Sequence, residues 1–366
     1  MIIGEVIRPA VKFIEGIKRT DKVAIVHGHD NDSICSAAIV YKLLEKTCKI
    51  EPKLIISGMN SSVTEDVLDA VRKFRPNHVV IVDLAEIPVR ILTELRNISQ
   101  VLIIDHHVPR GYVKVTYVNP RIFDKQSYLP ATYLCYKIYE DFLDAEGILW
   151  IAGIGTLSDM GLKNCNDLFD SIKSANKELV ENNENIDEFL FDNSLLGKLA
   201  KIFDSARVVN GVDGAVAALN VLIKYDNYQG VLNGKSVDTK NLLEWYTVAE
   251  KEFNRLLKDF ERNRKKSGKF VIYEVKSKYN MKSPLASYLG KTLTNEVLVI
   301  YQKSGKHISV SLRRGKVSIQ DLNQLAIKST KGIPDSNGGG HIQASGAALP
   351  AVHLNKFLRN LKSVKS

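Results

Sequence analysis

Short apolar runs alternate with segments of helical spacing in the first third of the chain. The apolar runs occupy residues 23–26, 54–57, 79–82 and 101–104. Between the first two runs, apolar residues recur at helical intervals from Ile34 to Leu44. Strands that alternate with helices in this way predict a parallel α/β sheet. We expect the helix after the first strand to begin at Ser33, because serine is a favoured N-cap residue.

The middle of the chain has a helical pattern throughout. Segments 130–140 and 148–160 are apolar and helical in spacing, and segment 166–266 is helical, charged and without a strand-like run. Residues 242–266 read as one long amphipathic helix. The basic run 262–269 follows it and contains Gly268, so we expect a linker there, with a solvated helix end as the alternative.

The composition changes after this run, which predicts a second domain. Short strands are expected at 270–275, 296–302 and 307–312, and the segment 336–341 closes the pattern. The predicted organisation is a catalytic domain over 1–165, a helical connector over 166–268 and a smaller α/β domain over 269–366.

Acidic and imidazole side chains follow three of the four predicted strands. The first strand leads into His27, His29, Asp30 and Asp32, the third into Asp83, and the fourth into Asp105, His106 and His107. A single aspartate after a strand is usually a turn former or a helix cap. Three such strand ends are different, because the carboxyl ends of parallel strands share the edge of the sheet where ligands bind. The pattern therefore predicts a metal site.

The residue types favour hard divalent cations. Asp30 and Asp32 are one residue apart, and two carboxylates so close repel one another unless a cation neutralises them. Oxygen ligands with imidazole suit manganese or magnesium better than zinc in a thiolate site. Asp83 can bridge two ions, and two ions about 3.5–4 Å apart can clamp a phosphoryl group and lower the pKa of water.

The sequence does not decide two of the metal-ligand positions. Asp159 lies between small residues after an apolar helix and is a candidate fourth acid, although an aspartate that merely ends the helix is the alternative. His27 and His29 both precede Asp30, and the spacing does not decide which of them binds metal. We slightly prefer His27, because it directly follows the strand.

The bulk properties restrict the cellular setting and the class of ligand. The 366 residues include 45% apolar and 25% charged residues, which is typical of a soluble protein with room for two domains. A net charge of +10 favours polyanions but does not separate a nucleic acid from a small nucleotide. The four cysteines form no CxxC pair, which predicts a cytoplasmic protein. No signal-peptide pattern is visible, and no apolar stretch approaches the ~20 residues that span a bilayer, so no membrane is expected.

The motifs resemble those of the DHH phosphoesterase superfamily. They are the segment 30–37, then Asp83, then Asp105-His106-His107, then Asp159, in the family order. Segment 338–346, which reads Gly-Gly-Gly-His-Ile-Gln-Ala-Ser-Gly, resembles the GGGHxxAAG motif of the DHH-associated C-terminal domain found with RecJ, and Ser311-Leu312-Arg313 resembles its Ser-x-Arg element. The family often has glycine in place of Ser33, but family II inorganic pyrophosphatases also have serine there.

This resemblance implies a role for each matching residue. It implies an α/β fold with a parallel-sheet DHH domain, a helical connecting region and a smaller C-terminal α/β domain. Two Mn²⁺ ions are implied, with Mg²⁺ as the alternative, and Asp105 would orient the site while His107 faces the scissile phosphate. The implied metal ligands are Asp30, Asp32, Asp83, His106 and Asp159, joined by His27 or His29. The implied substrate-binding residues are Ser311, Arg313, Gly338, Gly339, Gly340 and His341.

Three functions are compatible with these motifs. The first is an exonuclease on single-stranded RNA or DNA, of the RecJ-like archaeal type, among which a 3′ to 5′ direction is known. The second is the same chemistry on very short oligonucleotides, cyclic dinucleotides or 3′-phosphoadenosine phosphate. The third is a non-catalytic, replication-associated protein. Pyrophosphatase is disfavoured, because that family has a different C-terminal domain. The motifs determine neither polarity nor oligomeric state, and a homo-oligomer remains possible.

Overall fold

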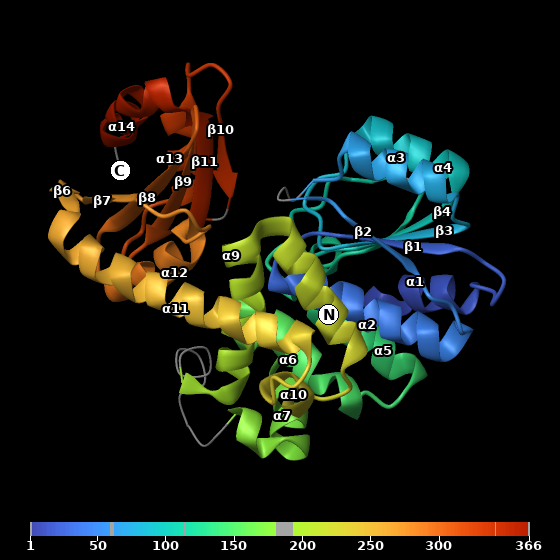
Figure 1. Ribbon diagram of the computed structural model, residues 1–366. Coiled ribbons are helices and arrows are strands. Elements are labelled where there is room, and N and C mark those ends of the chain that lie inside the picture. Colours follow the sequence, from blue (N-terminus) through green and yellow to red (C-terminus); the bar gives the residue numbers. More distant parts are fainter. Residues whose placement is uncertain (1, 59–61, 113, 181–192, 341, 365–366) are drawn as a thin grey trace. The chain divides into compact units, whose positions relative to one another are not determined.

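The chain forms two compact units. The computed structural model describes residues 2–58, 62–112, 114–180, 193–340 and 342–364. The first unit is Met1–Tyr246 and the second is Thr247–Ser366 (Figure 1). The division falls inside the long helix α11 (Val237–Asn263), and each unit is described by itself.

The first unit is built on a five-stranded parallel sheet. Its strand order is β2-β1-β3-β4-β5, and every neighbouring pair runs parallel. The strands are β1 (Val23–His27), β2 (Lys53–Ile56), β3 (His78–Val82), β4 (Gln100–Ile104) and β5 (Thr116–Val118). The four predicted apolar runs are confirmed as β1 to β4. Strands β1 and β3 are buried along their whole length, which explains why they are apolar throughout rather than alternating.

Helices cover both faces of this sheet. Along β1, Val23 and Ile25 face one core, whereas Ala24 and Val26 face the other. The first core is covered by α1 (Ile3–Glu15), α2 (Asn31–Cys48) and α5 (Ala131–Phe142). The second core is covered by α3 (Glu65–Phe74) and α4 (Val89–Ile98) (Figure 1). This arrangement places the ends of β1, β3 and β4 at one edge.

The expected start of the helix after β1 was wrong. Helix α2 begins at Asn31, and its N-cap is Asp30, whose Oδ1 accepts a hydrogen bond from the Ser33 backbone N–H at 3.0 Å. Aspartate caps a helix as well as serine does, and it reaches the N–H three residues ahead. Ser33 is therefore inside the first turn, where its hydroxyl is available for another partner.

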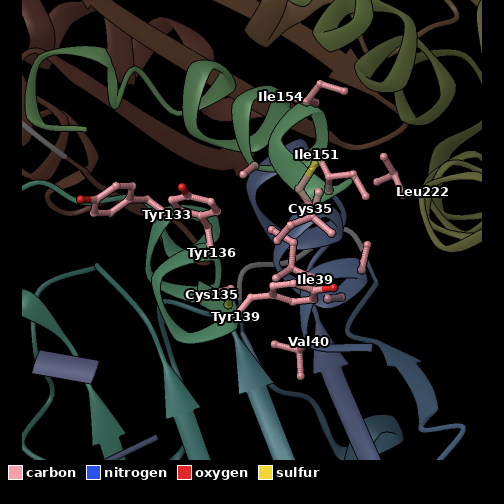
Figure 2. Close-up of a cluster of buried hydrophobic side chains, with 14 of the residues drawn as sticks. Cys35, Ile39, Val40, Tyr133, Cys135, Tyr136, Tyr139, Ile151, Ile154 and Leu222 are labelled. Atoms are coloured by element: carbon pink, nitrogen blue, oxygen red, sulfur yellow. The ribbon is translucent and has the colours of Figure 1, made fainter. Parts of the chain in front are cut away.

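The helical part of the chain continues the first unit. It contains α6 (Leu149–Ser158), α7 (Asn166–Ala175), α9 (Leu195–Lys224) and α10 (Tyr228–Leu232). Short 3₁₀ helices lie at Pro120–Ile122, Glu146–Ile148, Leu162–Asn164 and Lys177–Val180. Figure 2 shows Ile151 and Ile154 of α6 and Leu222 of α9 gathered in one core with side chains of α2 and α5. These helices thus pack into the sheet's own core instead of forming a separate body between residues 166 and 246.

Helix α9 is a broken helix with a tight internal turn. Gly211 has φ 59° and ψ −136°, which interrupts the helix. A Cβ on Gly214 would lie 1.9 Å from the Ala206 carbonyl oxygen, so the two arms approach backbone to backbone. By length and composition, α9 is the one helix among the described residues that could cross a membrane, contrary to the expectation of no such stretch. Core helices pass the same test, and this one contributes Leu199, Phe203 and Leu219 to the core.

The second unit is a six-stranded mixed sheet with helices on its faces. Its order is β10-β11-β9-β8-β7-β6, and β7 with β8 is the parallel pair in it. The strands are β6 (Lys265–Ser267), β7 (Phe270–Val275), β8 (Val297–Ser304), β9 (His307–Arg314), β10 (Asn337–Gly340) and β11 (Ala344–Pro350). The helices are α12 (Lys282–Thr292), α13 (Leu322–Thr330) and α14 (Leu354–Ser363), with a 3₁₀ turn at Ala351–His353.

The sequence-based expectations for this unit were partly right. The strands expected at 270–275, 296–302 and 307–312 are confirmed as β7, β8 and β9. The expected linker over 262–269 was wrong, because α11 runs to Asn263 and β6 then pairs with β7 in an antiparallel hairpin. Gly268 makes that turn with φ 57°, a conformation that favours glycine.

The close contact inside α9 makes a stability prediction. Replacing Gly214 with alanine forces the two arms apart and should lower the free energy of unfolding by about 1–3 kcal/mol. The matched control is Gly147→Ala, because a Cβ at Gly147 meets nothing within 4 Å. Urea unfolding of both variants measures the difference, and a Gly214→Ala variant as stable as the control would contradict the tight turn.

Candidate metal centre

Four of the predicted metal ligands surround a common point. His106 Nε2, at the end of β4, lies 3.4 Å from Asp83 Oδ1, 3.4 Å from Asp159 Oδ2 and 3.7 Å from Asp32 Oδ2. These residues come from the end of β4, the end of β3, the C-cap of α6 and the first turn of α2. Two overlapping groups of ligand atoms result, Asp32-His106-Asp159 and Asp83-His106-His107, and within each the atoms lie within 4.8 Å of one another.

Asp32 is held by the N-terminus of α5. Its two carboxylate oxygens accept hydrogen bonds from the backbone N–H groups of Ala131, at 2.9 Å, and Thr132, at 2.7 Å. Burial nevertheless raises the pKa of Asp32 to about 6, and the negative charge of Asp159 adds to the effect. The helix end thus orients the carboxylate without neutralising it.

Asp83 is the most constrained of these acids. Its backbone has φ 52°, an uncommon conformation for a residue other than glycine. Its Oδ2 accepts a 2.6 Å hydrogen bond from the Ser33 hydroxyl, whereas its buried Oδ1 has no hydrogen-bond partner among the described residues. Burial, and then the charges of Asp32 and Asp30, raise the pKa of Asp83 well above its usual value.

These features fit a bound divalent cation. An unpartnered, buried carboxylate oxygen is rare in proteins, and neighbouring carboxylates raise one another's pKa because their charges repel. A cation between the carboxylates gives the unpartnered oxygen a ligand contact and reduces the repulsion between the charges. The donor set of carboxylate oxygens and imidazole nitrogen, without a thiolate, suits Mn²⁺ or Mg²⁺.

His107 is hydrogen-bonded to Asp105 and also belongs to the group of ligand atoms that includes Asp83 and His106. Its Nδ1 donates to Asp105 Oδ1 at 2.8 Å, and its ring centre lies 4.6 Å from that of His106. Burial alone would lower the pKa of His107, but the hydrogen bond to Asp105 and nearby charge raise it overall. Asn119 Nδ2 donates to the His107 carbonyl oxygen at 2.9 Å, which holds the loop after β4 in place. The result is an oriented imidazole whose pKa is raised by its hydrogen bond to Asp105.

The two candidate histidines after β1 lie in different surroundings. His27 Nδ1 lies 2.7 Å from the Gly28 carbonyl oxygen, and because a carbonyl only accepts, Nδ1 carries the proton and Nε2 is a free acceptor. Burial lowers the pKa of His27 to about 4, so the ring is neutral, as a metal ligand must be. The pKa of His29 is lowered by burial and then by the charge of Arg207. Neither histidine belongs to the two groups of ligand atoms around His106.

Asp30 lies beside a cation that sequence reasoning missed. Burial alone would raise the pKa of Asp30, but the charge of Arg207 and then that of His29 lower it overall. Arg207 comes from α9, where its Nε donates to Asp204 Oδ1 at 2.6 Å. The side chain of Asn31 ties α9 to α2 by donating to the Ala200 carbonyl oxygen at 2.8 Å. No sequence motif marks Arg207, because it lies far along the chain in an otherwise ordinary helix.

Tyr128 and Arg121 are two further residues that the sequence did not mark. The Tyr128 hydroxyl donates to Asp159 Oδ2 at 2.8 Å, and its ring meets His106 edge-on at 5.4 Å between ring centres. The Arg121 guanidinium lies 5.9 Å from the centre of the Tyr128 ring. Both residues lie between β5 and α5 in a segment without periodicity, so only the folded chain brings Tyr128 to Asp159 and Arg121 to the Tyr128 ring.

The predicted substrate-binding residues belong to the second unit. Ser311 is buried on β9, and Arg313 on the same strand donates to the Ser287 hydroxyl at 3.3 Å and to the Leu312 carbonyl oxygen at 3.0 Å. Gly338, Gly339 and Gly340 form β10, and the Gly340 N–H donates to Asn323 Oδ1 at 3.1 Å. His341 lies outside the described residues.

The two units differ in charge. The first unit contains 28 Lys and Arg against 33 Asp and Glu, a net charge of −5, whereas the second contains 23 against 8, a net charge of +15. The positive excess of the chain is therefore confined to the second unit, whereas the carboxylate group around His106 belongs to the first.

The raised acid pKa values make a prediction for metal binding. A carboxyl group whose folded pKa is raised loses its contribution to stability as pH rises through that pKa, here about 6 for Asp32. Mn²⁺ replaces the lost protons, so it should raise the melting temperature more at pH 7.5 than at pH 5.5. Differential scanning calorimetry measures this, with Asp83→Asn expected to shrink the effect. An equal shift at both pH values would show that these acids do not bind the ion.

Comparison with known proteins identifies the two domains. Residues 22–150 match the DHH family, N-terminal domain, and residues 267–366 match the DHHA1 domain. No curated protein matches the chain.

Solved structures share the fold at low sequence identity. RecJ from Thermus thermophilus in complex with Mn²⁺ has a TM-score of 0.73 and 16% identity over 98% of this chain and 54% of RecJ, so the chain spans about half of that protein. A DHH domain from a member of the s1p family of ribosomal proteins has a TM-score of 0.71 and 16% identity over 100% of this chain and 93% of that one. CDC45 from Entamoeba histolytica has a TM-score of 0.61 and 10% identity over 98% of each chain. These structures share the fold across both domains. The two domain matches show that the chain belongs to the DHH phosphoesterase superfamily, with a DHHA1 domain over residues 267–366.

Proposed function

We propose that this chain is a metal-dependent phosphodiesterase that removes nucleotides from the end of single-stranded RNA or DNA. The observation that carries the proposal is the buried carboxylate group around His106, with its unpartnered Asp83 oxygen. Carboxylates gathered in this way destabilise the fold by electrostatic repulsion unless they bind a cation. A cation beside ionised carboxylates is suited to phosphoester chemistry.

The residues that would hold two Mn²⁺ ions, or Mg²⁺ ions, come from four strand and helix ends. They are His27, Asp30, Asp32, Asp83, His106 and Asp159, with His29 as the alternative to His27. When bound, such ions supply charge that polarises a phosphoryl group and lowers the pKa of water. Solved RecJ structures of the same fold contain Mn²⁺ and Mg²⁺, which supports this choice of ion.

The chain's own side chains would orient and complement the phosphate. His107, which is held by Asp105 and whose pKa that hydrogen bond raises, would face the scissile phosphate and donate a hydrogen bond to an oxygen on which negative charge develops. Tyr128 would keep Asp159 in place through its hydroxyl. The buried position of Asp83 would exclude bulk water from the carboxylate of the Asp83-His106-His107 group.

The second unit would bind the nucleic acid. Its net charge of +15 attracts a polyanion, whereas the acidic first unit would otherwise repel one. Ser311, Arg313 and the glycines of β10 would hold the nucleotide at the strand end, together with His341. We propose 3′ to 5′ as the direction to test first, and a cytoplasmic location.

A direct test is digestion of end-labelled single strands with Mn²⁺. We expect mononucleotides to be released and Asp83→Asn to reduce the rate at least ~100-fold, because it removes a charge that the ions need. The matched control is Asp69→Asn, since Asp69 is an exposed carboxylate on α3 that forms an ion pair with Arg72 of its own helix. If the wild-type chain releases no mononucleotide from any single strand, the proposal fails, and Mn²⁺ binding without turnover would favour a non-catalytic role.

Substrate length separates a strand exonuclease from an enzyme for short substrates. On a 20-residue oligonucleotide, kcat/KM should fall steeply as salt rises, because the basic second unit releases counterions from many phosphates. On a dinucleotide the salt dependence should be shallow. If the dinucleotide is the better substrate at every salt concentration, the alternative is correct: an enzyme for very short oligonucleotides, cyclic dinucleotides or 3′-phosphoadenosine phosphate.

A further inference from the structure

Four large apolar side chains are exposed in segments of the first unit that adjoin the candidate metal centre. Each is between 47% and 63% exposed, and they are Val108, Ile122, Phe123 and Met160. Val108 directly follows His107 in the chain, and Met160 directly follows Asp159. Apolar side chains that are exposed singly need no explanation, but a group of them beside a candidate catalytic centre marks a surface that binds a ligand or a partner.

The loop after α6 is tied to the segment between β5 and α5. The Tyr128 hydroxyl donates to Asp159 Oδ2 at 2.8 Å, and Asn164 Nδ2 donates to the Tyr128 carbonyl oxygen at 3.0 Å. Met160 lies in this loop with φ 58°, an uncommon conformation for a residue other than glycine, and its side chain is exposed. Both stretches of chain are therefore fixed beside the same carboxylate.

The segment between β5 and α5 is also fixed beside His107. Asn119 Nδ2 donates to the His107 carbonyl oxygen at 2.9 Å, and Asn119 Oδ1 accepts from the Arg121 backbone N–H at 2.9 Å. The Phe123 backbone N–H then donates to the Pro120 carbonyl oxygen at 3.1 Å, which closes the 3₁₀ turn. Phe123 is thus one short turn away from the residue that holds the loop after β4.

Arg121 adds a cation to this apolar group. Its guanidinium lies 5.9 Å from the centre of the Tyr128 ring, and its buried Nε has no hydrogen-bond partner among the described residues. A buried donor without a partner is rare in proteins, and the donors of a guanidinium match the oxygens of a phosphate. A guanidinium next to exposed apolar side chains is the combination that suits a nucleotide, which has an anionic phosphate and a flat, weakly polar base.

We propose that Phe123, Ile122 and Met160 form a platform for the base of the nucleotide whose phosphate binds at the metal centre. Arg121 donates to an oxygen of the same nucleotide's phosphate. The phenyl ring stacks on any base, and the thioether adapts to the shape of a flat ring. The occupant is a base because a phosphoester at the metal centre brings its own nucleoside to the segments that adjoin that centre. The inference rests on the proposed function, since it names the part of the substrate that the same site recognises.

Two ligands that differ by the base test the platform on the full chain with Mn²⁺. By isothermal titration calorimetry, adenosine 5′-monophosphate should bind about 10-fold more tightly than ribose 5-phosphate, because stacking of the base adds to the affinity of the phosphate. Phe123→Ala should remove most of this preference, and Phe123→Trp should retain it, because an indole also stacks. Arg121→Ala should weaken both ligands by a similar factor, because both contain the phosphate.

The matched control truncates an exposed apolar side chain elsewhere on the first unit. Ile98 is exposed at the end of α4, just before β4 begins, and so lies at the opposite edge of the sheet from the metal centre. Ile98→Ala should keep the preference for adenosine 5′-monophosphate. Both ligands are measured on the same variant, so a folding defect weakens both and leaves the ratio of their affinities unchanged. A change in the ratio therefore reports contact with the base.

The outcomes are distinguishable from those of the activity assay. The platform is overturned if the wild type binds both ligands equally, or if Phe123→Ala keeps the preference for adenosine 5′-monophosphate. The role of Arg121 is overturned if Arg121→Ala binds ribose 5-phosphate like the wild type. If the preference depends on Phe123 but no single strand is hydrolysed, the platform stands and the exonuclease proposal fails. If strands are hydrolysed and no preference for the base is found, the reverse holds.

Discussion

The candidate site of the first unit depends on the repulsion between carboxylates gathered around one imidazole. Oxygens of Asp32, Asp83 and Asp159 lie 3.4–3.7 Å from His106 Nε2, and burial together with neighbouring negative charge raises the pKa of Asp32 and of Asp83. Hydrogen bonds from the surrounding chain partly offset this repulsion. The N-terminus of α5 donates to Asp32, a hydroxyl of α2 donates to Asp83 and a phenol donates to Asp159. The buried Oδ1 of Asp83 has no hydrogen-bond partner among the described residues, and a cation is expected to bind there.

The second unit has the opposite constraint. Its excess charge is positive, and the partly buried guanidinium of Arg313 donates to two neutral groups, the Ser287 hydroxyl and the Leu312 carbonyl oxygen. Under the proposed function, a phosphate ester would suit both units, because its negative oxygens would suit the cations of the second unit and, through divalent ions, the acids of the first.

Local pattern predicted the parts of this protein that depend on short stretches of chain. The strands β1, β3 and β4 were evident from apolar runs, and their polar ends followed directly, because parallel strands bring their carboxyl ends to one edge. The error at Ser33 has the same origin: serine and aspartate are both good caps, and only the backbone path shows that Asp30 is the residue that caps α2. The basic run after α11 looked like a linker because a short edge strand such as β6 has no apolar signature.

The amino-acid sequence by itself determined the sheet, the order of the acidic motifs and the preference for hard cations, since these follow from residue type and spacing. Tertiary structure alone decided which side chains surround the residues of the acidic motifs. Tyr128 and Arg207 lie in unmarked segments, and their importance arises from packing, which brings a phenol to Asp159 and a guanidinium near Asp30. Contacts between residues distant along the chain depend on how helices pack, and no local pattern encodes that distance.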